Sequence, residues 1–263
     1  MRLKSISGGL LFLFVLCAMP GIALADGNQW DFQPRVTHVP ILMYHYVDTP
    51  PANADPVLLD LTVTRANFIA QMKWLKANGY QSITPDQLMN ALWHGAKLPA
   101  KPVLLTFDDG YANAWYNVTP ILKQFGYTGT FFVITNFVDQ SRSGYLTWSL
   151  ARQMQRLGMA IQDHTATHED VRDRSHAWYQ AEFVTSAKDI QKQIGIRPRY
   201  FCYPSGGYDD VAIHELQAAG FWAAFTENDS RYEYASNTFR LPRVRIRGSM
   251  NVTQFAEAVT DKR

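Results

Sequence analysis

The chain has 263 residues, of which 47% are hydrophobic and 18% are charged, a composition that supports one sizeable buried core. Its 25 basic residues nearly balance its 23 acidic residues, which argues against nucleic acid or an anionic membrane as the main partner. It has only two cysteines, which excludes the class of small secreted proteins held together by several disulfides.

The first 25 residues have the pattern of a secretory signal peptide. A short basic start precedes an apolar stretch over 9–19 that is too short to span a bilayer, and Ala23–Ala25 reads small-x-small. An uncleaved membrane anchor is the alternative. Cleavage after Ala25 removes two of the 25 basic residues and no acidic one, so a mature chain over 26–263 has 23 of each sign. We therefore expect an exported protein, periplasmic or extracellular, with Cys202 as its single cysteine and no transmembrane segment in the mature chain.

Strand-like and helix-like segments alternate along the mature chain. In chain order the pattern predicts a strand over 39–44, a non-helical loop through Pro50, Pro51 and Pro56, a helix over 64–78, a strand over 81–84, a helix from Pro85, a strand over 103–107, a helix over 112–125, a strand over 129–135, a helix over 147–157, a strand over 159–162, a helix over 176–194, a strand over 199–203, a helix over 209–219, strands over 221–225 and 244–247, and a helix over 251–259.

About seven β/α units in one unbroken domain predict an α/β fold, a distorted parallel (β/α)7-type barrel. Active sites of such barrels lie at the carboxyl ends of the strands. Candidate residues follow three of the predicted strands: His45 the first, Asp108 and Asp109 the third, and His164 the fifth. We therefore expect these residues to meet at one end of the barrel.

The types and spacing of these residues predict a metal-dependent hydrolase. His164 and His168 are four residues apart, so one helical turn would place both imidazoles on the same face. With Asp109 they form an open three-ligand site that suits zinc and that nickel, cobalt or iron(II) would also accept. Asp108 is then free to act as a base, and His45 is placed to donate a proton.

Each of these motifs also has a simpler interpretation. An Asp-Asp-Gly triplet is often a solvated turn, and Asp108 could cap the following helix. A lone pair of histidines four residues apart is often on the surface. The two motifs occur after strand-like runs in the order that a barrel site requires, and this favours the functional interpretation.

The chain resembles the NodB-type polysaccharide deacetylases, carbohydrate esterase family 4. Thr106–Gly110 matches the first motif of that family, His164–His168 the second and Phe201–Gly206 the third. Pro40–His45 and Leu241–Arg243 are similar to the branch with reordered motifs, which includes the poly-β-1,6-N-acetylglucosamine deacetylases.

The resemblance implies a role for each matched residue. Asp108 would be the catalytic base, His45 the general acid, and the backbone N–H of Ser205 a donor to the oxyanion. The metal ligands would be Asp109, His164 and His168.

Three positions depart from the family pattern or remain ambiguous. The third motif usually contains an arginine that orients the catalytic aspartate, and Cys202 stands there instead. Arg243 is then either the replacement for that charge or an ordinary surface arginine. Asp163 precedes His164, the first histidine of the second motif, and it either supports the His164 side chain or simply ends a strand.

Tyr111 and Trp148 lie near predicted strand ends and could stack on sugar rings. The sequence therefore predicts an exported, monomeric, metal-dependent deacetylase that releases acetate from the N-acetyl groups of a polysaccharide, with poly-β-1,6-N-acetylglucosamine as a candidate. An O-acetyl sugar esterase of the acetylxylan type and a non-catalytic glycan-binding protein of the same fold are the alternatives.

Overall fold

The structure is a computed structural model that describes residues 30–261. The expected signal peptide and its cleavage site lie outside these residues. Across 30–261, no helix is long and apolar enough to cross a bilayer.

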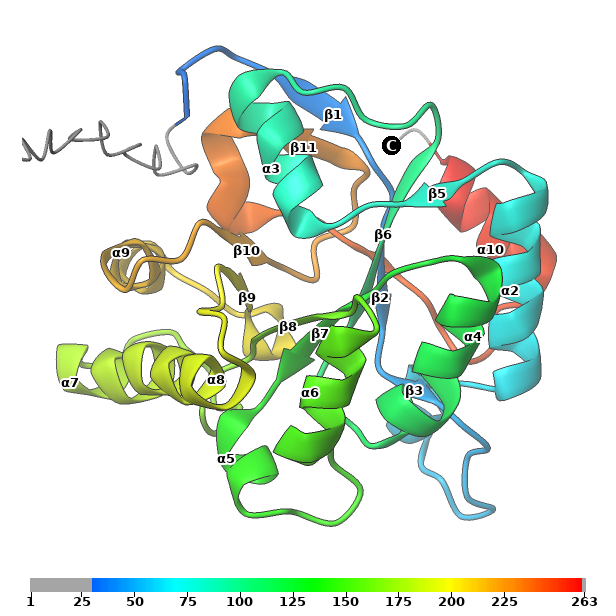
Figure 1. The fold of residues 1–263 in the computed structure, drawn as a ribbon, viewed down its shortest axis with the longest axis horizontal. Coiled ribbons are helices and arrows are strands. Elements are labelled where there is room, and N and C mark those ends of the chain that lie inside the picture. The colour runs from blue at the N-terminus through cyan, green and yellow to red at the C-terminus, as the bar shows by residue number, and fades with distance from the viewer. Residues whose placement is uncertain (1–29, 262–263) are drawn as a thin grey trace, which may run out of the picture.

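A curled sheet of parallel strands forms the centre of the molecule (Figure 1). Its strands pair in the order β10-β9-β8-β7-β6-β2-β12, and β5 pairs with the first part of β6. The strands are β2 (Ile41–Tyr44), β5 (Gln81–Ser82), β6 (Pro102–Phe107), β7 (Thr130–Val133), β8 (Ala160–Asp163), β9 (Tyr200–Cys202), β10 (Ala223–Phe225) and β12 (Val244–Arg245). The predicted distorted parallel barrel is confirmed.

One short segment joins the two edges of this sheet. Leu241 pairs with Phe225 of β10, whereas Val244 and Arg245 pair with Leu42 and Met43 of β2. Chain 241–245 therefore crosses the seam of the barrel, and Arg243 lies between its two pairings.

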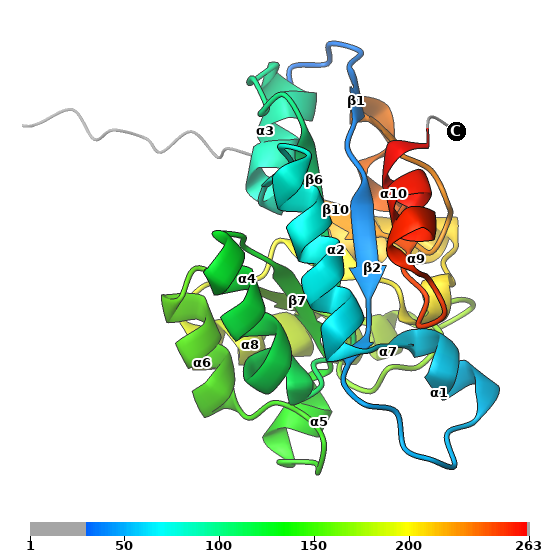
Figure 2. The same cartoon turned by 90° about the vertical axis from the view of Figure 1, so that its right-hand side faces the viewer.

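Helices cover the outside of the barrel, and most of them bury apolar side chains on their inner face, whereas α1 has no buried residue. They are α1 (Pro56–Leu61), α2 (Arg65–Ala77), α3 (Pro85–His94), α4 (Thr119–Phe125), α5 (Thr135–Asp139), α6 (Trp148–Arg156), α7 (His176–Tyr179), α8 (Ser186–Ile194), α9 (Asp210–Ala218) and α10 (Val252–Thr260). Figures 1 and 2 show α2 and α10 side by side, where Trp74 and Phe255 pack edge to face at 5.8 Å.

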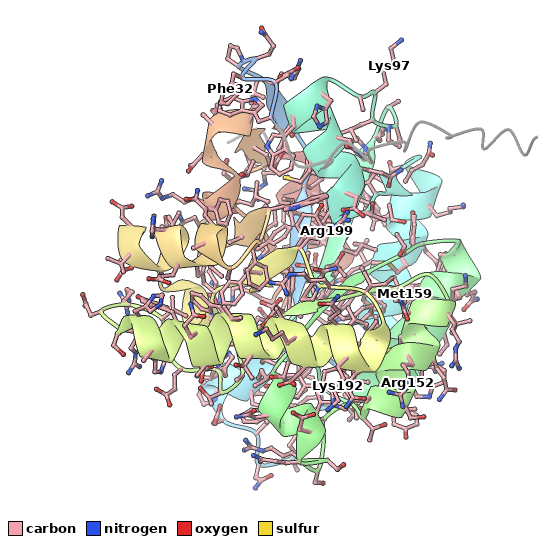
Figure 3. The ribbon with its side chains drawn as sticks, turned by 60° about the vertical axis from the view of Figure 1, so that its left-hand side comes forward. Phe32, Lys97, Arg152, Met159, Lys192 and Arg199 are labelled. Atoms are coloured by element: carbon pink, nitrogen blue, oxygen red, sulfur yellow. The ribbon has the colours of Figure 1, made fainter. Side chains whose placement is uncertain are left out.

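Residues 30–261 also contain four helical segments of other types: the π-helical turns η1 (Ala114–Val118) and η2 (Gln180–Thr185), and the 3₁₀ segments η3 (Pro204–Gly206) and η4 (Ala235–Arg240). The turn η2 joins α7 to α8 without a break, so the predicted helix over 176–194 is confirmed with one π-helical turn inside it. Figure 3 shows Arg152 of α6 beside Lys192 of α8, and Arg152 donates to the carbonyl oxygen of Gln193.

The expectation that the proline-rich loop contains no helix was wrong. Helix α1 begins at Pro56, with Asp55 as the N-cap that accepts a hydrogen bond from the backbone N–H of Leu58. Proline fits the first helical position because its missing N–H would have no partner there. Two small sheets were also not foreseen: β1 (Val36–His38) pairs antiparallel with β11 (Tyr232–Tyr234), and β3 (Tyr46–Val47) pairs with β4 (Thr62–Val63).

Candidate metal centre and active site

The candidate residues converge at the carboxyl ends of the parallel strands, as the barrel fold requires. His45 follows β2, Asp108 and Asp109 follow β6, and the segment 164–168 follows β8. Asp109 and Gly110 both have positive φ, at 71° and 72°, and a Cβ on Gly110 would lie 3.1 Å from the side chain of Val133. Glycine is therefore required for the sharp turn that presents the two carboxylates.

Asp109, His164 and His168 form a compact group of potential ligands. Oδ1 of Asp109 lies 3.2 Å from Nε2 of His164 and 3.2 Å from Nε2 of His168. Their ligand atoms all lie within 4.8 Å of one another. Asp109 and His164 are buried, and His168 is partly exposed, so the group opens to solvent on one side.

The hydrogen bonding of His164 shows that a cation fits this group. Its Nδ1 lies 2.7 Å from the carbonyl oxygen of Cys202, and because a carbonyl only accepts, Nδ1 carries the proton. In neutral His164 the lone pair of Nε2 then faces the carboxylate of Asp109. Oδ1 of Asp109 is buried and has no hydrogen-bond donor among the described residues. Two nitrogen atoms and one carboxylate oxygen in this arrangement suit a divalent ion of the zinc type.

The segment that carries the two histidines is not a helical turn, contrary to the expectation from their spacing. Residues 164–168 form a loop in which Thr165 and His168 both have φ of 65°. Positive φ is unusual for such side chains and requires support from neighbouring groups. Oγ1 of Thr165 supplies part of that support by accepting from the backbone N–H of His168 at 2.8 Å.

Two buried carboxylates hold the rest of this loop. Asp163 accepts from the backbone N–H of Thr165 at 2.9 Å and from the Ser186 hydroxyl at 2.7 Å, and burial raises its pKa to about 8. Glu182, on η2, accepts from the backbone N–H groups of Ala166 and Thr167, both at 2.9 Å. Asp163 therefore supports the histidine loop rather than simply ending a strand, and Glu182 is a supporting residue that the sequence did not reveal.

Asp108 is held by a buried arginine. Nη1 and Nη2 of Arg243 donate to Oδ1 and Oδ2 of Asp108, each at 2.8 Å, and Nε donates to the carbonyl oxygen of Thr226. The Arg243 side chain has no exposed surface, so it is not a surface arginine. Burial alone raises the pKa of Asp108, but the Arg243 guanidinium outweighs this effect and holds the pKa below its ordinary value. Asp108 is therefore a fixed, ionised carboxylate beside the ligand group.

His45 lies on the other side of Asp108. Its Nε2 is 3.9 Å from Oδ2 of Asp108, and its side chain is 11% exposed. Burial lowers the pKa of His45, and the nearby charges of Asp108 and Asp109 oppose that effect. An imidazole in this position reaches the same space as the Asp108 carboxylate, which is the arrangement that an acid and base pair needs.

The remaining candidate residues differ in position. Ser205 is exposed, with φ of 52° in the turn after β9. Tyr111 is partly exposed and stacks on Tyr46. Trp148 is 8% exposed and packs in the core, where its indole N–H donates to Asp139. Little of the Trp148 side chain is therefore open to a sugar, and its stacking on a sugar ring stays a prediction.

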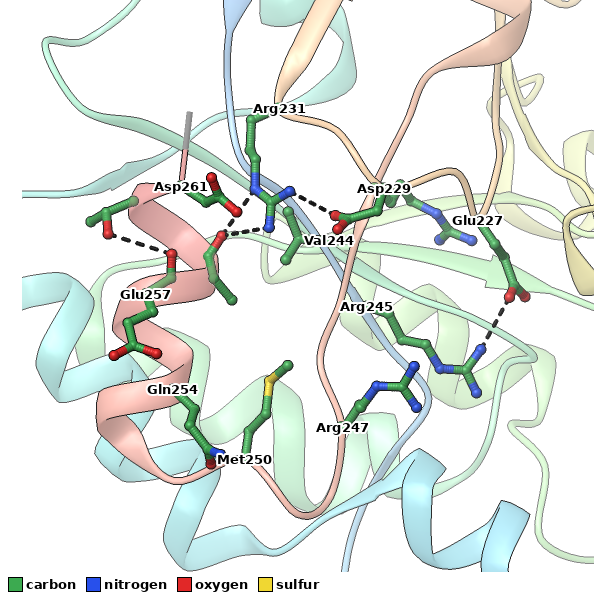
Figure 4. Close-up of a pocket in the computed structure, with 13 residues that line it drawn as sticks. Glu227, Asp229, Arg231, Val244, Arg245, Arg247, Met250, Gln254, Glu257 and Asp261 are labelled. Atoms are coloured by element: carbon green, nitrogen blue, oxygen red, sulfur yellow. Dashed lines mark hydrogen bonds and ion pairs between the residues drawn. The ribbon is translucent and has the colours of Figure 1, made fainter. Parts of the chain in front are cut away.

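A second cavity of about 620 Å³ lies between α10 and the segment around β12 (Figure 4), and Arg243 is among its lining residues. Two ion pairs lie within its lining: Arg231 with Asp229 at 2.7 Å and Arg245 with Glu227 at 3.0 Å. Arg247, which also lines it, pairs with Asp60 at 2.9 Å outside the lining.

Comparisons with known proteins agree with this geometry. The polysaccharide deacetylase family model matches residues 95–224. A polysaccharide deacetylase from Bacillus cereus is 30% identical, with a TM-score of 0.75 over 86% of this chain and 70% of that one.

The chain belongs to the polysaccharide deacetylase family. The predicted family and the prediction of a hydrolase are thereby confirmed. A Streptococcus pyogenes deacetylase solved in complex with acetate is 28% identical, with a TM-score of 0.79 over 87% of this chain and 100% of that one. The poly-β-1,6-N-acetyl-D-glucosamine N-deacetylase of Escherichia coli K12 is 27% identical over 76% of this chain, and the match spans 36% of that longer protein.

Proposed function

We propose that this polysaccharide deacetylase is an exported, metal-dependent N-deacetylase that converts N-acetylglucosamine units of a glycan to free amine and acetate. The observation that carries the proposal is the pairing of two different carboxylates. Asp109 faces two histidine nitrogens at 3.2 Å, whereas both oxygens of Asp108 accept from Arg243 at 2.8 Å. One carboxylate is thus available to an ion and the other to a proton.

The ligands would be Asp109, His164 and His168, with zinc as the favoured ion and nickel, cobalt or iron(II) as alternatives. When bound, such an ion polarises the acetamide carbonyl and lowers the pKa of water. The loop supports from Asp163 and Glu182 fix the ligand positions before any ion binds, since they act on backbone N–H groups.

The chain's own residues supply the proton transfers. Asp108 takes a proton from the attacking water, and Arg243 keeps that carboxylate ionised and oriented. The backbone N–H of Ser205 donates to the oxygen that becomes negative as the tetrahedral centre forms, an interaction that elsewhere contributes about 3–4 kcal/mol. His45 donates a proton to the departing nitrogen as the C–N bond breaks, and the products are acetate and an amine.

The test is acetate release from a panel of β-1,6- and β-1,4-linked N-acetylglucosamine oligomers, peptidoglycan and acetylxylan, with added zinc, cobalt or nickel. We expect release from an N-acetylglucosamine glycan that chelation abolishes and that Asp108→Asn removes. Release from acetylxylan alone would identify an esterase. Glycan binding without release from any substrate would identify a non-catalytic glycan-binding protein.

The similarity to the Escherichia coli protein favours poly-β-1,6-N-acetylglucosamine within this panel. The neutral mature chain and the signal-like first 25 residues favour an exported enzyme that acts on a neutral polymer. Mass analysis of the mature N-terminus after expression with the full leader tests export, with cleavage after Ala25 expected.

A further inference from the structure

We propose that a groove beside the reactive centre binds the neutral sugar unit next to the one being deacetylated, with Tyr116 as its exposed stacking surface. This inference rests on the proposed function, because it assigns the groove to the same substrate. The groove has a volume of about 360 Å³, and its lining includes Tyr46, Asp48, Leu58, Asn113, Tyr116 and Asn117.

The groove borders the reactive centre through Tyr46. Tyr46, which follows His45 in the chain, lines it and stacks on Tyr111 with ring centroids 3.7 Å apart. Tyr111 in turn directly follows the Asp108–Gly110 turn that carries the two carboxylates. A glycan unit whose acetyl group lies at Asp109 would therefore have its neighbour beside Tyr46, at the start of the groove.

The lining has the chemistry that a neutral sugar requires. Apart from the exposed Asp48, its side chains are uncharged, in contrast to the arginine-lined cavity beside α10. Tyr116 is 64% exposed, so its ring face is open to pack against the apolar face of a sugar. Asn113 and Asn117 add amide groups, which can both donate to and accept from hydroxyls.

The groove is also held in shape in the absence of any ligand. Nδ2 of Asn117 donates to the carbonyl oxygen of Val47 at 2.8 Å and fixes strand β3. The opposite wall, α1, is fixed through Asp60, whose carboxylate pairs with Arg245 and Arg247 at 3.2 and 2.9 Å.

Gly248 fixes the same wall through close backbone contact. Its N–H donates to the carbonyl oxygen of Asp60 at 2.7 Å. A Cβ at this position would collide with the carbonyl oxygens of Leu59 and Thr62. Because the groove is preformed, its residues lose little conformational entropy when a sugar binds, and this favours binding of a further unit of a polymer.

The experiment compares substrates of increasing length. Steady-state kinetics are measured on N-acetylglucosamine and on its β-1,6- and β-1,4-linked oligomers, with p-nitrophenyl acetate as a probe of the reactive centre alone. We expect kcat/KM to rise with length for one linkage. Tyr116→Ala is expected to lower kcat/KM for the longer oligomers about tenfold, mainly through KM, because the ring binds ground state and transition state alike.

Two variants serve as controls. Tyr116→Phe keeps the ring and should retain the preference for long substrates. Tyr234→Ala removes another exposed tyrosine, 52% exposed on β11 outside the groove, and should leave all rates unchanged.

The failures are distinguishable. If kcat/KM is equal for the monomer and the oligomers, the groove assignment is overturned and the proposed function stands. The same conclusion follows if Tyr116→Ala lowers kcat/KM equally for p-nitrophenyl acetate and for the oligomers. No acetate from any glycan overturns the proposed function and the groove assignment with it.

Discussion

Replacing Arg243 by glutamine tests whether this arginine keeps Asp108 ionised and in place. Arg243 and Asp108 are both buried, with side-chain exposures of 0% and 2%, and are joined by two hydrogen bonds of 2.8 Å. Removing one partner of a buried pair costs about 3–5 kcal/mol of folding free energy, because the other charge stays buried without compensation. Urea unfolding of Arg243→Gln should show a loss of this size.

Exposed Arg247 provides the matched control. It is 52% exposed and pairs with Asp60 at 2.9 Å. Surface pairs of this kind contribute about 0–1 kcal/mol, so Arg247→Gln should unfold close to wild type. The double variant Asp108→Asn/Arg243→Gln should lose less stability than the sum of the two single variants, since no unpaired charge remains buried.

The pH dependence of kcat/KM gives the second measurement. In the wild type the guanidinium holds the pKa of Asp108 below its ordinary value, so the base is ionised at neutral pH. In the Arg243→Gln variant the Asp108 carboxyl stays buried but has lost the guanidinium beside it, so its pKa rises. The acid limb of kcat/KM then moves to higher pH, and displacement of the carboxylate lowers kcat/KM at neutral pH by about 100-fold.

Arg243→Lys separates charge from geometry. Lysine restores a positive charge but not the two-point contact, so the acid limb should return toward that of the wild type while kcat/KM stays low. An Arg243→Gln enzyme that is correctly folded, with an unshifted acid limb and an unchanged kcat/KM, would refute the assigned role.

Three further predictions concern the ligand loop and a buried acid remote from it. Glu182→Ala should lower the zinc affinity of the metal-free protein about 10–100-fold in equilibrium dialysis, whereas Glu182→Gln keeps an acceptor and much of the affinity. Zinc at about 100 times its Kd should stabilise the wild type by about 2.7 kcal/mol, and His168→Ala should abolish this gain in thermal melts. Burial holds the pKa of Glu233 well above its ordinary value, so this carboxyl ionises in the unfolded chain at a lower pH than in the folded protein. The free energy of unfolding therefore falls as pH rises between the unfolded and the folded pKa. Glu233→Gln should reduce the slope of this fall by about 1.4 kcal/mol per pH unit, and equal slopes in both proteins would contradict the prediction.

Most of the fold was predictable because its signals are local. Apolar runs bounded by glycine, and helices opened by Thr64, Thr84 and Thr147 as N-caps, define elements without reference to distant residues. The error at α1 was also local, since Pro56 was taken as a helix breaker although Asp55 makes it a first helical residue. The pairing of β1 with β11 joins segments almost 200 residues apart, and no local pattern specifies such a contact.

Within the site, the residues in contiguous motifs were found, and Arg243 and Asp163 were named as candidate supports, whereas the support from Glu182 was missed. The geometry of His164 and His168 was misjudged because a spacing of four fits a helix and equally a loop with two positive φ angles. Glu182 lies 14 positions beyond His168 in the chain and reaches the loop only through a π-helical turn. A lone glutamate in an amphipathic helix gives no sign of such a contact.

Arg243 shows why an altered motif need not mean a lost function. Cys202 occupies the position at which a third-motif arginine was expected, and its Sγ lies 3.1 Å from Nη2 of Arg243. The guanidinium thus comes from segment 241–245, which crosses the barrel seam, yet it lies beside Asp108, the carboxylate that a third-motif arginine would orient. A small side chain at position 202 is what leaves room for it, because both groups are fully buried. We therefore expect Cys202→Arg to place two guanidinium groups against one another and to unfold the protein. Shortening Arg243 as well should relieve this repulsion, so in thermal melts Cys202→Arg/Arg243→Ala should be more stable than Cys202→Arg. If Cys202→Arg alone melts at the wild-type temperature, the two positions are not alternatives for one charge.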